Sequence, residues 1–217
     1  MARRTKEESQ RSRERILDAA IEVFHARGVA RPSLSDVAQL AGATRGAVYV
    51  HFKNKSDVFN ALCDRIRLPP EAVTAASDAA PSPDPLGQLR NGWVDFLRTV
   101  ARDTQMQKIL DIIFHRCEQV EENGQILERM QRGRREGMAS MAKLIQQAID
   151  RGQLPADLRG DLALSLFHAA LAGILSDWLF APEGLDLEAE AGQIVDALIE
   201  MLRSSPSLRA RGAKPLG

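Results

Sequence analysis

Residues 33–55 read SLSDVAQLAGATRGAVYVHFKNK, and this stretch decides the fold. Apolar residues recur in its first half at positions i, i+3, i+4 and i+7, a spacing that predicts one short amphipathic helix. The members of this stripe are Leu34, Val37, Ala38 and Ala41. Ser33 stands at the N-cap position of that helix, and Asp36 follows three residues later as its partner in a short-armed capping box.

The second half of the stretch predicts another short helix after a turn. Gly42 provides the backbone freedom that a tight turn requires, and Thr44 is a suitable N-cap for the helix that follows. Two helices joined by such a turn are typical of a helix-turn-helix, whose second helix lies in the major groove of DNA. The alternative, an αα-hairpin inside some other helical domain, stays open on spacing alone.

Charge is distributed unevenly along the chain. The 29 Lys and Arg residues balance the 29 Asp and Glu residues, so the net charge indicates no particular partner. Residues 1–67 contain 13 basic and 8 acidic side chains, whereas residues 68–202 contain 12 basic and 21 acidic side chains. A basic segment on an acidic body suits a phosphate-binding module that keeps the body away from DNA, although modest imbalance of this kind is common.

Composition and cysteine usage bound the class of protein. A chain of 217 residues with 44% hydrophobic and 27% charged residues is ordinary for a globular protein. No apolar run approaches the roughly 20 residues that a membrane span needs, and the charged N-terminus lacks the apolar core of a signal peptide. Cys63 and Cys117 form no CxxC or Cys/His cluster and are expected to be reduced. We therefore expect a cytoplasmic protein that has no contact with a membrane.

Helical periodicity continues on both sides of the helix-turn-helix, so the predicted class is all-α. A first helix is expected over about residues 6–25 and a fourth from Lys55 to Leu68, before a proline-rich stretch. The pattern predicts four segments: a three-helix helix-turn-helix DNA-binding domain at 1–67, a linker at 68–85, a larger helical domain at 86–205, and a tail at 206–217 that is expected to be disordered.

The chain resembles a known family. Residues 10–62 match the pattern of TetR-family transcriptional regulators almost without gaps. Later stretches resemble one branch of this family, the AcrR-type repressors of multidrug efflux operons. These stretches are MARRTKEE at 1–8, IIFHRCE at 112–118, LPADL at 154–158, WLFAP at 178–182 and SPSLR at 205–209. One departure is Val50, where these relatives usually carry an aromatic residue; it concerns base preference and not the fold.

The resemblance implies a ligand-responsive repressor with three kinds of partner, in which the helical domain at 86–205 is the effector-binding and dimerisation domain. It would bind a palindromic operator in double-stranded DNA as a homodimer and be released by a small hydrophobic effector such as a drug. A TetR-type regulator that responds to a metabolite, such as a fatty acid or an acyl-thioester, is the alternative within the family.

Two other classes of function are less well supported by the residues. We find no metal-spaced His/Cys cluster, no phosphate-binding glycine loop and no nucleophile elbow, so no enzymatic activity, cofactor or metal site is expected. A purely structural helical adaptor would leave Arg45, Tyr49 and Lys55 without a role.

Helix geometry and the family pattern together suggest the DNA contacts. The candidates are Ser33, Ser35, Thr44, Arg45, Gly46, Ala47, Tyr49, His51 and Lys55. Arg45 is the candidate for a guanine edge, since a bidentate contact of this kind discriminates by about 1–3 kcal/mol. Tyr49, His51 and Lys55 are candidate phosphate contacts that set the register. The alternatives are a half-buried core tyrosine for Tyr49 and a local cap or surface histidine for His51.

The C-terminal domain has more apolar surface than one-sided packing would use. Candidates for a four-helix dimer interface on the last two helices are Leu162, Leu166, Ile174, Trp178, Ile194, Leu198 and Met201. Aromatic and methionine side chains also suit an adaptable cavity for apolar ligands. The candidate effector pocket is lined by Ile66, Trp93, Phe96, Leu110, Phe114, Met138, Met141, His168 and Leu171. For both groups the plainer alternative is the core of a single subunit.

Overall fold

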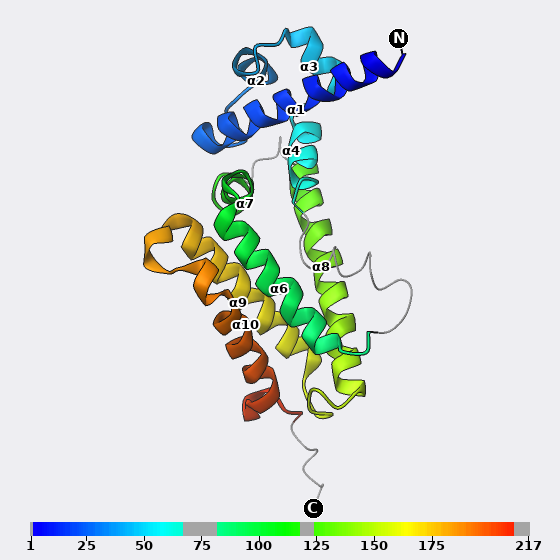
Figure 1. Ribbon diagram of the computed structural model, residues 1–217, viewed down its shortest axis with the longest axis vertical. Coiled ribbons are helices and arrows are strands. Elements are labelled where there is room, and N and C mark those ends of the chain that lie inside the picture. The colour runs from blue at the N-terminus through cyan, green and yellow to red at the C-terminus, as the bar shows by residue number, and fades with distance from the viewer. Residues whose placement is uncertain (1, 67–81, 118–123, 211–217) are drawn as a thin grey trace, which may run out of the picture. The chain divides into compact units, whose positions relative to one another are not determined.

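Every regular element is a helix in the computed structural model, which describes residues 2–66, 82–117 and 124–210 (Figure 1). The predicted all-α class is therefore confirmed. The α-helices are α1 (Ala2–Arg27), α2 (Leu34–Leu40), α3 (Arg45–His51), α4 (Lys55–Cys63), α6 (Pro85–Arg102), α7 (Thr104–His115), α8 (Gly124–Asp150), α9 (Gly160–Phe180) and α10 (Leu187–Ser204). Two short 3-10 helices are η2 (Pro182–Gly184) and η3 (Pro206–Leu208).

The chain divides into two compact units. The first unit contains Met1–Ile66 and Asp103–Arg132, and the second contains Arg67–Arg102 and Gly133–Gly217. Helix α7, which the sequence assigned to the effector domain, thus belongs with the helix-turn-helix, and α8 contributes residues to both units. The predicted domain limits stay a prediction, and most of the predicted linker, residues 68–81, lies outside the described residues.

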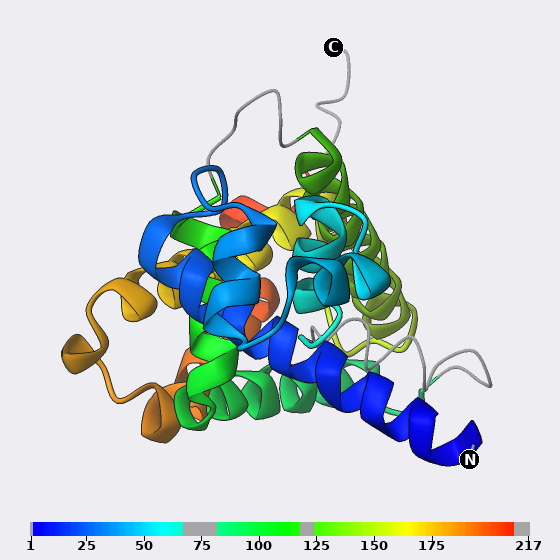
Figure 2. The same ribbon diagram turned by 90° about the horizontal axis from the view of Figure 1, so that it is seen from above.

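In the first unit, α1 packs against α2, α3, α4 and α7 (Figure 2). Its buried stripe repeats at helical spacing and consists of Ile16, Leu17, Ala20, Ile21 and Phe24. The helix begins at Ala2, earlier than predicted, and ends at Arg27. It ends there because Gly28 adopts a φ of 76°, a conformation that other residues rarely accept.

Helix α4 is shorter than the sequence predicts, since it ends at Cys63 instead of continuing to Leu68. Arg65, just beyond its end, reaches back to α1, where it forms ion pairs with Glu14 and Asp18. Residues 64–66, which directly follow α4, are therefore fastened to α1 by side-chain contacts.

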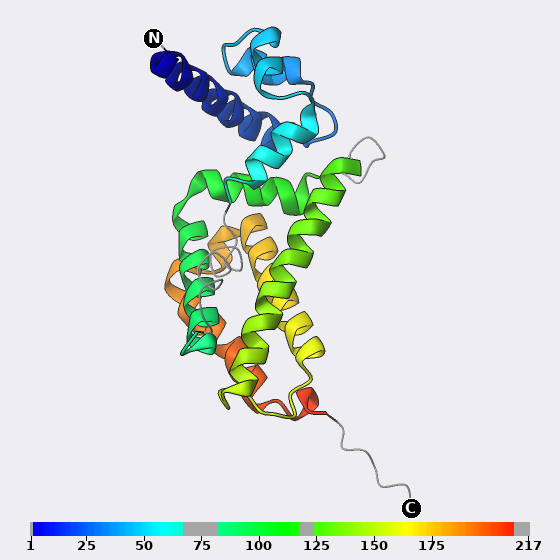
Figure 3. The same ribbon diagram turned by 90° about the vertical axis from the view of Figure 1, so that its right-hand side faces the viewer.

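In the second unit, α6 runs closely along α10 (Figure 3). The apolar stripe of α6 is buried and includes Leu86, Leu89, Trp93, Phe96, Leu97 and Val100. Two ion pairs flank it: Arg90 bonds to Asp196 at 2.5 and 2.7 Å, and Arg102 bonds to Glu188 at 2.6 Å. Exposed pairs of this kind add little stability, so apolar burial is what holds these helices together.

The start of the predicted disordered tail is ordered. The N–H of Arg159 donates to the carbonyl of Leu208 at 2.8 Å, and the N–H of Ala210 donates to the carbonyl of Asp157 at 2.7 Å. Leu208 is 2% exposed, so an apolar anchor accompanies these backbone bonds. The LPADL and SPSLR stretches, distant in sequence, thus lie together. The rest of the predicted tail, residues 211–217, lies outside the described residues.

Replacing Leu208 by alanine should therefore destabilise the protein by about 2–3 kcal/mol, because it removes a buried side chain and leaves a cavity. Urea-induced unfolding would measure this loss. Ser207→Ala, at the exposed position before it, should leave the unfolding midpoint unchanged. Equal midpoints for Leu208→Ala and the wild type would mean that residues 206–210 do not pack as described.

Candidate nucleic-acid interface and effector site

The capping box predicted at the start of α2 is present. The Asp36 N–H donates to Ser33 Oγ at 3.3 Å, and the Ser33 N–H donates to the Asp36 carboxylate at 2.8 Å. The Ser33 hydroxyl also donates to this carboxylate, at 2.6 Å. These bonds from Ser33 lower the pKa of Asp36, and the charge of Arg27 lowers it further. The cap therefore uses the Ser33 hydroxyl, and a phosphate contact by Ser33 stays a prediction.

Local contacts fix the orientation of α3. Gly42 in the preceding turn has a φ of 61°, as the turn requires, and the Ala47 N–H donates to the Thr44 side chain at 3.1 Å. Val48 and Phe52 are 0% and 3% exposed and face the interior of the first unit. The remaining positions of α3 are therefore turned toward solvent, as a recognition helix requires.

Arg45 and Tyr49 form a pair on the exposed face of α3. The guanidinium carbon lies 5.4 Å from the centre of the tyrosine ring, and Nη2 donates to the tyrosine hydroxyl at 3.4 Å. Tyr49 is 45% exposed, which argues against its alternative role as a half-buried core residue. The stack orients the guanidinium while other N–H donors of Arg45 stay available for a base edge or a phosphate.

Gly46 and Val50 are further exposed positions of α3, beside this pair. A Cβ atom added at Gly46 would meet only the Thr44 hydroxyl, at 3.9 Å, so the backbone is open to close approach. Val50, one helical turn later, is 79% exposed. The residues predicted to contact DNA did not include Val50, although its i+4 spacing from Gly46 was a usable signal. Ser35 is exposed, and Ala47 and His51 are partly exposed.

Lys55 makes two internal hydrogen bonds that the sequence did not predict. Its ammonium group donates to the carbonyl of Ala30 at 2.5 Å and to that of Pro32 at 3.1 Å. Both acceptors lie in the loop between α1 and α2, so the charge of Lys55 stabilises that loop. Its predicted phosphate contact stays a prediction, and it would have to coexist with these internal bonds.

A buried carboxylate joins α7 to α1. Asp111 hydrogen-bonds to His115 Nδ1 at 2.8 Å and to Arg116 Nε, and it lies 3.3 Å from His25 Nε2. Burial alone would raise the pKa of Asp111, but the hydrogen bonds from Arg116 and His115 and the neighbouring positive charge outweigh burial and lower it. Burial lowers the pKa of His25 more than Asp111 raises it. The carboxylate is therefore ionised at neutral pH and holds the two helices together.

Two further contacts strengthen this junction. The Val29 N–H donates to the carbonyl of Arg116 at 3.1 Å, and Lys108 bonds to Glu22 at 2.6 and 2.8 Å. Much of the IIFHRCE stretch thus has a structural task within the first unit. Over residues 2–66, 82–117 and 124–210, no group of three or more His, Cys, Asp or Glu side chains is placed to hold a metal ion.

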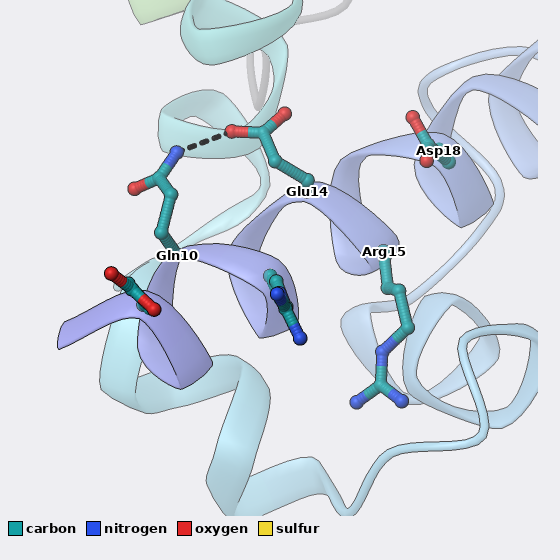
Figure 4. Close-up of a pocket in the computed structure, with 6 residues that line it drawn as sticks. Gln10, Glu14, Arg15 and Asp18 are labelled. Carbon is teal, nitrogen blue, oxygen red and sulfur yellow. Dashed lines mark hydrogen bonds between the residues drawn. The ribbon is translucent and has the colours of Figure 1, made fainter. Parts of the chain in front are cut away.

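An open groove runs along α1 between long polar and charged side chains. Gln10 and Glu14 lie on it and bond to each other at 2.6 Å, and Arg15 points away from this pair (Figure 4). The full lining is Glu7, Gln10, Arg11, Glu14, Arg15 and Asp18. All of these residues lie on one helix and none of them belongs to the predicted effector pocket, so this groove is not that pocket.

The residues predicted to line the effector pocket divide between the two units. Ile66, Leu110 and Phe114 belong to the first unit, and the other six belong to the second. In the second unit Trp93 meets Phe96 and Phe167 edge to face, with ring centres 5.6 and 6.5 Å apart. Met141 and Leu171 are also buried, and Met138 and His168 are partly exposed. The pocket itself stays a prediction.

The apolar residues of α9 and α10 fall into two stripes. One stripe is buried within the second unit and consists of Ala163, Phe167, Leu171 and Leu175 on α9 with Leu187, Ala191, Val195, Ile199 and Leu202 on α10. None of the seven residues predicted for the dimer interface is buried, and Leu166 is 42% exposed. By length and composition α9 could cross a membrane, but the core helix of a soluble protein passes the same test. In this structure 28% of the apolar window of α9 is buried.

Two family models match the chain. Residues 16–62 match the model described as bacterial regulatory proteins, tetR family. Residues 84–204 match the model described as MAATS-type transcriptional repressor, C-terminal region. The two matches together cover the helix-turn-helix and most of the remaining chain.

Individual proteins resemble the chain over nearly its whole length. The HTH-type transcriptional regulator TtgR of Pseudomonas putida is 36% identical over 209 residues, which are 96% of this chain and 100% of TtgR. The crystal structure of MexZ of Pseudomonas aeruginosa is 33% identical with a TM-score of 0.78, covering 93% of this chain and 100% of MexZ. SmeT of Stenotrophomonas maltophilia, in its complex with triclosan, is 31% identical with a TM-score of 0.77, covering 95% and 99%.

The internal role of Lys55 gives a prediction that needs no DNA. Lys55→Met keeps the length of the side chain but removes the donor to two carbonyl groups, so it should cost about 1–2 kcal/mol of unfolding free energy. Urea unfolding of the protein alone would measure it. Lys53→Met, at a neighbouring exposed lysine, is the matched control and should have no effect. If both variants are as stable as the wild type, Lys55 does not support the loop.

Proposed function

Because this chain belongs to the TetR family of transcriptional regulators, we propose that it is a ligand-responsive repressor of a multidrug efflux operon. Two similar proteins support this choice of target: MexZ is described as a key repressor responsible for antibiotic resistance, and SmeT as the repressor of a multidrug efflux pump. Its action on operator DNA would take place in the cytoplasm, and regulation of this kind requires no catalysis by the chain.

The observation that carries the proposal is the outward face of α3. Tyr49 orients Arg45, and Gly46 and Val50 form an exposed, uncharged surface beside this pair. In the major groove, Arg45 would bind a guanine edge and Val50 would contact a thymine methyl group. Tyr49 and His51 would contact phosphates that set the register. These assignments are proposals for the operator complex.

Dimerisation is the second part of the proposal. A single helix-turn-helix reads too few base pairs for specificity, so two copies would bind half-sites about 34 Å apart or at a multiple of this distance. The second, unburied stripe of α9 and α10 is the surface that a second copy would cover. Two such helix pairs would form a four-helix bundle across a two-fold axis.

Effector binding would weaken DNA binding through α8. This helix contributes residues to both units, and in the first unit its Arg129 bonds to Asp64 at the end of α4 at 2.8 Å. A ligand that favours one packing of the effector domain would therefore act on the helix that follows the recognition helix. The coupling must be reciprocal, and typical values are about 1–3 kcal/mol.

The direct test is binding of the purified protein to its own upstream intergenic DNA at fixed salt, with and without triclosan and a panel of antibiotics. We expect sequence-specific binding that several unrelated hydrophobic compounds release. Release by fatty acids or acyl-thioesters alone would favour the metabolite-sensing alternative. The absence of specific binding would refute the proposed role of α3.

Arg45→Ala should weaken specific operator binding by about 1–3 kcal/mol, because it removes the proposed guanine contact. Binding to unrelated DNA should weaken less, so the ratio of specific to non-specific affinity should fall. Fluorescence anisotropy with operator and scrambled duplexes would measure both affinities. Arg98→Ala removes the same charge from an exposed site on α6 and should leave both unchanged. An unchanged ratio for Arg45→Ala would contradict base reading by Arg45.

Leu166→Glu should convert the dimer into monomers, because it places a charge on the apolar surface that a second copy would cover. Sedimentation velocity would give the mass of each species, and operator affinity should fall with the loss of the dimer. Leu127→Glu, at a similarly exposed leucine on α8, is the matched control and should stay dimeric. A dimeric Leu166→Glu protein would exclude this surface as the interface.

A further inference from the structure

The two tryptophans of the chain have different partners. The indole N–H of Trp178 donates to the carbonyl of Leu185 at 2.9 Å. Trp93 is only 7% exposed, yet its indole N–H has no hydrogen-bond acceptor among the described residues. A buried tryptophan normally finds a partner for this group, because a buried donor without an acceptor loses its hydrogen bond to water and gains none in return. The unpaired donor of Trp93 therefore requires an explanation.

Two other buried atoms without a partner among the described residues are less informative. They are the side-chain oxygens of Asn60 and Gln88. An amide can exchange its oxygen and nitrogen by a rotation of 180°, which changes an acceptor into a donor at the same place. An indole ring has one polar atom with one role. Of these three buried groups, only the Trp93 indole has an unambiguous role: it is a donor, and the partner that it lacks is an acceptor.

The surroundings of Trp93 are aromatic. Phe96 on the same helix and Phe167 on α9 contact it edge to face. A phenyl face can accept an N–H group only weakly, so it would not replace an oxygen acceptor. A flat aromatic molecule placed here would gain ring contacts as well as the missing hydrogen bond.

The same region lacks a partner for a positive charge. In the described part of the second unit, no Asp or Glu side chain is buried. His168, next to Phe167, has its pKa lowered by burial and by the charge of Arg134, so it is neutral at pH 7. A cationic ligand buried here would lose its hydration without a compensating carboxylate.

We propose that the indole N–H of Trp93 is the polar anchor of the effector site and donates to an oxygen acceptor of an uncharged aromatic effector. The inference rests on the proposed function, because it assigns a ligand class to the effector site of that repressor. It narrows the class of effector from hydrophobic drugs in general to neutral aromatic molecules with a carbonyl, ether or phenol oxygen.

The test uses two probes that differ in the acceptor alone. Benzophenone carries a carbonyl between two phenyl rings, and diphenylmethane carries a methylene group there. Direct titration of the full-length protein should show benzophenone binding about threefold to tenfold more tightly. In Trp93→Phe, which keeps an aromatic ring without the donor, the two affinities should become equal. Benzyltrimethylammonium, a cationic aromatic probe, should bind more weakly than benzophenone to the wild type.

A second readout does not depend on the stability of a variant. The two indole N–H groups give separate signals in a ¹H–¹⁵N spectrum, and loss of one signal in Trp93→Phe assigns both. Benzophenone should shift the Trp93 signal downfield and leave the Trp178 signal in place. Diphenylmethane should cause a smaller shift of the Trp93 signal.

Equal affinity of the wild type for the two probes, or a Trp93 signal that benzophenone does not move, would overturn the anchor. Operator binding and its release by triclosan, measured on the same sample, separate this failure from failure of the proposed function. Intact release by triclosan with an unmoved Trp93 signal would refute the anchor alone. Failure of all aromatic compounds to bind would refute both the anchor and drug-dependent release.

Discussion

A helix of seven residues is not stable by itself, because nucleation costs more than so few hydrogen bonds return. Helix α3 therefore depends on the burial of Val48 and Phe52 against the rest of the first unit. The guanidinium of Arg13 on α1 also lies over the Phe52 ring, 5.4 Å from its centre. This anchoring decides which face of α3 is turned outward, and the Arg45–Tyr49 pair occupies that face. Recognition of DNA by this helix would thus rest on apolar packing.

Features that depend on neighbours within one helical turn were predictable from the sequence. The caps at Ser33, Thr44 and Asp186 are bonds between residues three positions apart, so residue type and spacing suffice to find them. The bonds of Lys55 were not predictable, because its acceptors lie 25 and 23 residues earlier in the chain. From sequence alone, a lysine at the start of a helix is expected to be a solvated surface charge, because the loop that supplies its acceptors is brought near it only by the fold.

The body of the protein shows a similar limit. Periodicity predicted α9 and α10 correctly, but it merged the residues of α9 into one wide apolar face. The structure separates that face into a buried stripe, which includes Phe167, and a partly exposed stripe, which includes Leu166. Which stripe a helix buries depends on the helices that pack on it, and a single sequence does not contain that information. The unpaired indole N–H of Trp93 could not be predicted from the sequence for the same reason.

The half-covered apolar stripe of α9 also has a consequence for gene control. If two copies must associate there before either binds DNA firmly, promoter occupancy at low expression rises with the square of the protein concentration. A small change in synthesis or degradation then produces a sharper change in transcription than a monomeric repressor would give. Newly made subunits would also spend time with this surface uncovered, so that their rate of pairing would compete with aggregation and proteolysis.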